Sequence, residues 1–273
     1  MKRFSFWSIT LLLITLTVFT INRKSSAEKT VHQPIETTKP VEQVSEPVLS
    51  AVDVFDSYIT QVYDKMDLSK TGLELDVFRK AVIGYYNLKD GQKLSSDKNI
   101  ISIADFTKTS RSKRLWIVDL DSQKLLFNTF VAHGQGSGND MATSFSNTPN
   151  SHQSSMGFYL TNETYFGKHG LSLKLDGMDE GYNTNARARA VVVHGAEYVS
   201  TGTIKQLGRL GRSHGCPAVP VELTKPIIET IKGGTVLFIN GPEEVYTSDF
   251  LNTEFAASKY AGSVSASATT AQI

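Results

Sequence analysis

The spacing of the apolar residues changes at Asp90-Gly91, which divides the chain into a helical part and a strand-rich part. Over residues 51–88 apolar side chains recur every three or four positions, and this period is typical of amphipathic helices. Gly72 interrupts the pattern near its middle. The pattern therefore predicts a helical hairpin over residues 51–90.

Beyond residue 91 the apolar residues form short runs rich in Ile, Val, Leu and Phe, which are typical of strands. A helix is predicted over residues 224–231, because Pro226 stands in its first turn and Gly233-Gly234 follow its end. Residues 91–246 are therefore expected to form a mainly β domain with short helices, preceded by the α-helical hairpin. The predicted strands cover residues 100–106, 115–120, 124–131, 157–161, 171–175, 190–193 and 235–240.

Three other segments are polar and lack apolar periodicity. Residues 28–50 carry three prolines among polar residues, which predicts a flexible linker. Residues 247–273 are rich in Ser, Ala and Thr, which predicts a disordered tail. Residues 134–153 form a long loop rich in Gly and Ser, and compact domains seldom keep such a loop without a functional reason. We therefore expect this loop to border the functional site.

The first residues carry the pattern of an export signal. Met1-Lys2-Arg3 is basic, and residues 4–21 contain no charge. This arrangement is typical of a signal peptide or of an N-terminal membrane anchor within residues 1–27. The small residues Ser25-Ser26-Ala27 favour cleavage before Glu28. The protein is therefore expected to be exported, to the periplasm or the cell envelope.

Composition and charge narrow the possible functions. Charged residues make up 20% of the chain and the formal net charge is +1, so no strong field favours nucleic acid. His133, His152 and His169 fall in no HExxH or CxxC pattern, so we expect no metal. The glycines of residues 134–138 lack the lysine and the strand-to-helix setting of a phosphate loop. Nucleotide binding is therefore not expected.

Cys216 is the only cysteine of the chain, so it has no disulfide partner within the chain. His194 stands at the end of a predicted strand, 22 positions before it. A thiol with an ordinary pKa of about 8.5 is mostly protonated at neutral pH, so a nucleophilic cysteine needs a base. His194 or His214 could supply it, and Gly215 would let a substrate approach the thiol. The segment therefore predicts nucleophilic catalysis by Cys216.

These motifs resemble the L,D-transpeptidase catalytic domain family, which is also called YkuD-like. That family carries a His-Gly pair and, after a variable loop, a Ser/Thr-His-Gly-Cys signature. The matching residues here are His194-Gly195 and Ser213-His214-Gly215-Cys216. The subgroup of murein L,D-transpeptidase catalytic domain proteins is matched further, at Phe130-Val131-Ala132-His133-Gly134, Gly136-Ser137-Gly138, Phe145-Ser146-Asn147, Ser154-Ser155-Met156-Gly157-Phe158-Tyr159 and Gly208-Arg209-Leu210-Gly211-Arg212.

The resemblance implies a β-sandwich or barrel in which Cys216 attacks a peptidoglycan stem peptide and His194 is the base. It also implies that the carbonyl of Gly195 orients the imidazole. The acyl-enzyme would then react with the amine of a neighbouring stem to form a 3→3 cross-link. No metal or organic cofactor is required in the family. Loop support and the oxyanion hole are expected from Ser213, His214 and Gly215.

Substrate binding is expected from side chains near these motifs. Arginines that flank them could bind the carboxylates of the stem peptide or of its diamino acid through paired hydrogen bonds. Two further residues of the matched motifs are assigned to the same cleft. The expected partner is peptidoglycan, on which a monomer would act, and N-terminal membrane anchorage stays open. The predicted substrate-binding residues are Arg187, Arg189, Arg212, His133 and Tyr159.

Other functions are compatible with the same motifs. A hydrolase that passes the acyl group to water, such as an L,D-carboxypeptidase or a link-cleaving enzyme, would carry the same residues around Cys216. A papain-like peptidase is disfavoured, because in that type the cysteine precedes the histidine. A non-catalytic wall-binding module that docks through residues 51–88 is disfavoured by the intact pair of His194 and Cys216.

Overall fold

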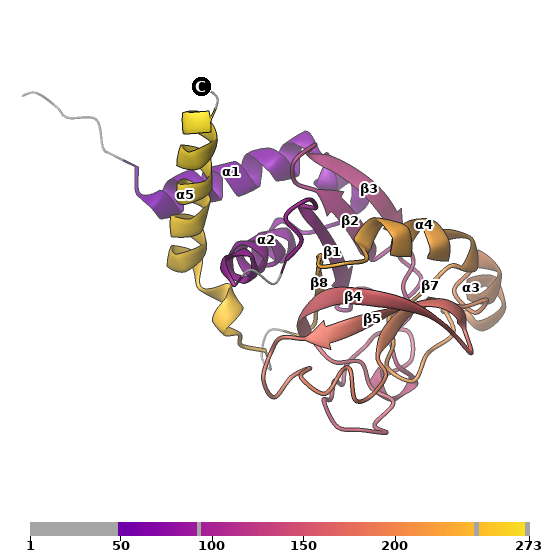
Figure 1. Cartoon of the computed structure of the whole chain (residues 1–273). Coiled ribbons are helices and arrows are strands. Elements are labelled where there is room, and N and C mark those ends of the chain that lie inside the picture. Colours follow the sequence, from indigo (N-terminus) through magenta and orange to yellow (C-terminus); the bar gives the residue numbers. More distant parts are fainter. Residues whose placement is uncertain (1–48, 92–93, 243–245, 271–273) are drawn as a thin grey trace, which may run out of the picture. The chain divides into compact units, whose positions relative to one another are not determined.

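The computed structural model describes residues 49–91, 94–242 and 246–270 (Figure 1). The predicted signal peptide or anchor over residues 1–27 lies outside the described residues, as does most of the predicted linker. Among the helices that are described, none is both long and apolar enough to cross a lipid bilayer.

Two helices precede the sheet, as the apolar periodicity predicts. Helix α1 covers Ala51–Lys65 and helix α2 covers Leu75–Asp90, with a short 3-10 helix, Leu68–Thr71, between them. Ser50 caps α1 through reciprocal hydrogen bonds with Asp53, which satisfy N–H groups that have no partner within the helix. The predicted helical hairpin is therefore present.

Eight strands form one sheet in the order β3-β2-β1-β8-β4-β5-β6-β7, with β1–β8 and β6–β7 parallel and the other neighbours antiparallel. Ala132, beyond β3, pairs with Ala218 of β7 through two backbone hydrogen bonds of 2.8 and 3.4 Å. The two edges of the sheet thus meet, and the sheet is nearly closed into a barrel. The predicted mainly β fold class is confirmed. The strands are β1 Ile100–Asp105, β2 Leu115–Asp119, β3 Lys124–Thr129, β4 Gly157–Gly167, β5 Gly170–Gly177, β6 Val192–Gly195, β7 Ala218–Val219 and β8 Val236–Asn240.

The sheet separates two apolar cores, because successive residues of a strand point to opposite faces. In β1, Ile101 and Ile103 pack with the apolar side chains of α1 and α2. Ile100 and Ala104 pack in the second core, to which helix α4, Val221–Ile231, contributes. α4 begins three residues before the predicted helix and α3, Thr201–Leu207, was not predicted. α3 buries none of its residues, so it has no apolar period to detect.

The C-terminal segment differs from the disordered tail expected over residues 247–273. It forms a 3-10 helix, Asp249–Leu251, and helix α5, Thr253–Thr270, which contacts α1 and α2 (Figure 1). Ala256 and Ala257 are fully buried in this contact. Small residues let the helices approach closely, so the contact needs few large apolar side chains and leaves little periodicity in the sequence. We call α1, α2 and α5 together the helical cap.

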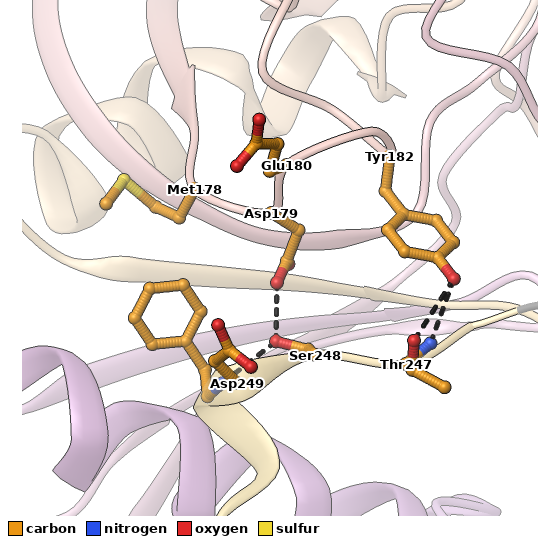
Figure 2. A pocket seen from close by; sticks show the side chains of 8 residues that line it. Met178, Asp179, Glu180, Tyr182, Thr247, Ser248 and Asp249 are labelled. Carbon is orange, nitrogen blue, oxygen red and sulfur yellow. Dashed lines mark hydrogen bonds between the residues drawn. The ribbon is translucent and has the colours of Figure 1, made fainter.

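Asp179, in the turn after β5, ties the start of this C-terminal segment to the sheet. Its carboxylate accepts hydrogen bonds from Ser248 and from Tyr246. Figure 2 shows the bond to Ser248 and the contact of Tyr182, in the same turn, with Thr247. Asp179, Tyr182, Thr247 and Ser248 border a cavity of about 420 Å³. Because Asp179 is nearly fully buried and its bonds reach Tyr246 and Ser248, it holds the segment before α5 against the turn after β5.

Candidate active site

Strands β6 and β7 bring the two motif segments together. They are parallel neighbours, and their register pairs His194 with Ala218 and Gly195 with Val219. Cys216 lies two residues before Ala218, so the cysteine loop enters the sheet beside the strand that carries His194. This is the convergence of strand end and glycine loop that the sequence predicts. We call Cys216, His194 and residues 213–215 the cysteine site.

The imidazole of His194 is buried and held in one orientation. Its Nδ1 lies 2.9 Å from the carbonyl oxygen of Gly195, the contact that the family resemblance implies. A carbonyl only accepts, so Nδ1 carries the proton and Nε2 keeps its lone pair. Burial lowers the pKa of His194, the bond to Gly195 opposes this shift, and the nearby His169 adds to it. The imidazole is therefore neutral near pH 7 and suited to act as a base.

His169 was not predicted as part of this site. It lies in the turn between β4 and β5, and its exposed ring stacks on that of His194 with 4.4 Å between the ring centroids. From its sequence context, His169 was weighed only as a metal ligand. No local pattern relates it to His194, because the contact depends on the pairing of β5 with β6.

The thiol of Cys216 is half-buried and lies near the start of β6. Its Sγ is 3.7 Å from the carbonyl oxygen of Ala190. Burial raises the pKa of Cys216, whereas the backbone N–H of Val192 and the charge of Arg189 lower it. Because burial is the largest of these effects, the resting group is a thiol, and a base is needed to form the nucleophile.

Ser213 fixes the shape of the loop before Cys216. Its hydroxyl donates to the carbonyl of Cys216 at 2.6 Å and accepts the N–H of Gly215 at 3.0 Å. The N–H of Gly215 is therefore engaged, which leaves the N–H groups of His214 and Cys216 as candidates for the expected oxyanion hole. The exposed ring of His214 stacks on that of His152 at 4.2 Å, which favours a role in loop shape over that of a base.

The loop over residues 134–153 borders the cysteine site, as expected. Gln135 donates its N–H to the carbonyl of Ser213, and the hydroxyl of Ser154 donates to the carbonyl of Gly215 at 3.3 Å. Gly215 itself has φ +119, and a Cβ there would lie 2.7 Å from the carbonyl oxygen of Gln153. Only glycine fits this position without displacing the loop.

Two predicted substrate-binding residues are buried in the interior, which corrects their assignment. His133 and Tyr159 have no exposed surface, so a substrate does not reach them in this structure. His133 contacts the buried guanidinium of Arg114 through Nδ1 at 2.6 Å, and burial beside this cation lowers its pKa to about 4. The hydroxyl of Tyr159 donates to the carbonyl of Ser155. The sequence gives the type of each residue but not how deeply its side chain is buried.

The predicted arginines are near the site, but their side chains already have partners. Arg187 forms ion pairs with Glu163 and Asp176, on strands β4 and β5. Arg212 donates to the carbonyl of Gly138 at 2.7 Å. Both arginines therefore hold protein groups in place, rather than presenting free donors to a carboxylate.

A cavity of about 380 Å³ opens at the start of β6. Ala190 and Val192 line this cavity. The carbonyl oxygen of Ala190 contacts Sγ of Cys216, and the backbone N–H of Val192 lowers the pKa of the thiol. Within the described part of the chain, no three His, Cys, Asp or Glu side chains gather in a group that could hold a metal ion. The remaining lining residues are Tyr165, Lys174, Leu175, Arg187 and Val191.

Comparison with known proteins gives one family and several solved structures. The model of the L,D-transpeptidase catalytic domain family matches residues 69–240. No match is found among curated proteins. An L,D-transpeptidase from Mycobacterium smegmatis is 11% identical, with a TM-score of 0.33 and coverage of 53% of this chain and 59% of that chain.

Two other solved structures are similar to a comparable extent. An L,D-transpeptidase from Mycobacterium tuberculosis is 13% identical, with a TM-score of 0.32 and coverage of 53% of this chain and 58% of that chain. The helical cell shape determining protein Pgp2 from Campylobacter jejuni, as a mutant, is 12% identical, with a TM-score of 0.38 and coverage of 66% and 64%. This chain thus spans less than two thirds of each of these structures.

Proposed function

Because the chain belongs to the L,D-transpeptidase catalytic domain family, which matches residues 69–240, we propose that it is an acyltransferase of peptidoglycan with Cys216 as nucleophile. The observation that carries this proposal is the contact of His194 Nδ1 with the carbonyl of Gly195. This contact leaves Nε2 of His194 unprotonated. His194 lies on β6, which pairs with β7, the strand that begins two residues after Cys216. Nucleophilic catalysis by cysteine requires a neutral, oriented base and a thiol that it can deprotonate, and the state of His194 supports its assignment as that base.

The first half-reaction forms a thioester. Nε2 of His194 takes the proton of the Cys216 thiol, and the sulfur attacks the carbonyl carbon between the third residue of the stem and its terminal D-Ala. The N–H groups of His214 and Cys216 would stabilise the oxyanion. When the C–N bond breaks, the imidazolium returns its proton to the departing amine, and D-Ala leaves.

The second half-reaction regenerates the enzyme. The amine of a diamino acid in a neighbouring stem attacks the thioester carbonyl, and Nε2 of His194 takes the proton that this nitrogen loses. The C–S bond then breaks and the imidazolium returns the proton to sulfur. The product is a 3→3 cross-link, and the thiol of Cys216 is restored. If water replaced the amine, the product would be a free tripeptide.

Peptidoglycan lies outside the cytoplasm, so this function requires export. We therefore extend the proposal to a protein of the periplasm or cell envelope, in agreement with the basic and apolar pattern of residues 1–27. We also propose that the catalytic unit is a monomer. The two segments of the cysteine site pair within one chain, so a second copy is not needed to bring them together.

The proposal is tested with purified full chain and disaccharide-tetrapeptides, whose products are identified by mass spectrometry. Dimers that lack one terminal D-Ala would support the transferase, whereas tripeptide monomers alone would identify a hydrolase. Cys216→Ala is expected to abolish either product, and Cys216→Ser is the matched control for side-chain size. Full activity of the alanine variant would refute the proposed nucleophile. A carbapenem should add its mass covalently to the wild type but not to C216A.

A further inference from the structure

Arg189 donates hydrogen bonds to four residues of segment 146–155, which borders the cysteine site. Its Nη1 donates to the carbonyl of Ser146 at 2.7 Å and to the hydroxyl of Ser155. Its Nη2 donates to the hydroxyl of Ser151 at 3.2 Å and to the carbonyl of Gln153 at 2.6 Å. Each terminal nitrogen of a guanidinium has two hydrogens, so both nitrogens are saturated. A substrate carboxylate that bound these two nitrogens would have to displace their bonds, contrary to the paired hydrogen bonds expected from the sequence.

The same side chain lies against the nucleophile loop. The carbonyl of Gln153, which Arg189 holds, packs against the α-carbon side of Gly215, where a Cβ would be only 2.7 Å away. Nη2 of Arg189 is 3.3 Å from that same position. The next residue along the chain, Ala190, contacts Sγ of Cys216 with its carbonyl oxygen. The guanidinium thus lies between residues 146–155 and Gly215, the residue before the thiol.

We propose that Arg189 is a positioning residue of the cysteine site, which holds residues 146–155 against Gly215 and whose positive charge favours the thiolate of Cys216. This inference rests on the proposed function in one respect, namely that Cys216 is the nucleophile. It replaces substrate binding as the role of Arg189. The guanidinium acts on the substrate only through the sulfur atom and the loop.

The other groups around the thiol do not supply this charge. His194 of β6 is neutral, because burial lowers its pKa. Tyr198, in the loop after β6, has a pKa raised to about 12 by burial and by the charge of Cys216, so its hydroxyl stays protonated. The N–H of Val192 is a dipole without net charge. Among the described groups that influence this thiol, Arg189 is therefore the cation that opposes the effect of burial.

The proposal is tested by the pH dependence of alkylation of Cys216 by iodoacetamide in the full chain. The thiolate sulfur displaces iodide and forms an S–C bond, so the rate follows the thiolate fraction. In Arg189→Gln the midpoint is expected to rise by about one pH unit, which makes alkylation about tenfold slower below both midpoints. In Arg189→Lys, which keeps the charge but loses the planar fork, the midpoint should stay within about half a unit of wild type.

Arg212→Gln is the matched control, because Arg212 holds carbonyls of the neighbouring loop residues but is not among the groups that shift this thiol. Its midpoint is expected to equal that of the wild type. An unchanged midpoint in R189Q, or an equal rise in R212Q, would overturn the proposal. If R189Q does not fold, R189K decides, since a rise of a full unit with the charge present would also overturn it. Alkylation requires no peptidoglycan chemistry, so failure of the transferase assay is a separate result.

Discussion

The helical cap and the cysteine site are stabilised by different forces. In the cap, the rings of Phe55, Tyr58, Tyr86 and Tyr260 pack with centroid distances of 4.5 to 6.4 Å. Around Cys216, hydroxyls, carbonyls and guanidinium groups hold the loops through directed hydrogen bonds. Apolar packing contributes mostly free energy of folding, whereas hydrogen bonds also fix where individual atoms lie. Substitutions in the cap should therefore lower stability, and substitutions at the site should lower activity.

The largest effect is expected at the proposed base. His194→Gln should lower kcat/KM for cross-linking by about a thousandfold, because the thiol of Cys216 loses its proton acceptor, while the melting temperature changes little. His169→Gln, which removes only the stacked ring, should cost less than about tenfold. For each variant, kcat/KM is measured by muropeptide analysis and the melting temperature by thermal unfolding, on the same sample. A large loss of stability in H194Q with unchanged kcat/KM would break the comparison.

The complementary effect is expected in the helical cap. Phe55→Ala should lower the free energy of unfolding by about 3 to 4 kcal/mol, because the phenyl ring is fully buried and leaves a cavity. Leu49→Ala, at a position that is 64% exposed, should cost less than about 0.5 kcal/mol. Urea unfolding measures both values. Below the unfolding transition, alkylation of Cys216 in F55A should match that of the wild type, and slower alkylation would show that the two regions are coupled.

Mild acid should act on the sheet through the buried His133, whereas the cap contains no histidine to titrate in this range. The pKa of folded His133 is lowered to about 4 from 6.5. Between these values the unfolded chain binds more protons, so the free energy of unfolding falls as the pH is lowered. The expected loss from this group is about 3 kcal/mol by pH 4, and none above pH 7. His133→Gln should flatten the profile measured by urea unfolding, and an equally steep profile would assign the loss to other groups.

A smaller effect is expected for alanine substitutions at two glycines, which distinguish backbone strain from contact with the loop beside Gly215. Gly215→Ala places a side chain at φ +119 and 2.7 Å from the carbonyl of Gln153. Gly233→Ala has a similar left-handed backbone, with φ +78, but open space around its Cβ. Each should lose about 1 to 2 kcal/mol of stability in thermal unfolding. Only G215A should also slow acyl transfer, by about tenfold or more, because it displaces the loop. Equal activities of the two variants would contradict the proposed role of the loop.

Local pattern predicted the elements that repeat along the chain. The helices of the hairpin follow from apolar residues at helical spacing, and the central strands follow from short apolar runs. Helices α3 and α5 were not predicted from the sequence. α3 buries none of its residues, and α5 buries small residues such as Ala256 and Ala257, which leave no strong apolar period. The cysteine motif was predictable for a different reason, since Ser213 to Cys216 are adjacent in sequence and their hydrogen bonds are local.

The sequence by itself determined which groups can perform chemistry: a single thiol in a Ser-His-Gly-Cys segment and a histidine at the end of a strand. Only the tertiary structure decided the roles of their neighbours. It buried His133 and Tyr159, and it saturated Arg189 with loop acceptors. The physical reason is that burial and hydrogen-bond partners depend on residues far apart in the chain. The partners of Arg189 lie 34 to 43 positions before it, and no local pattern records that distance.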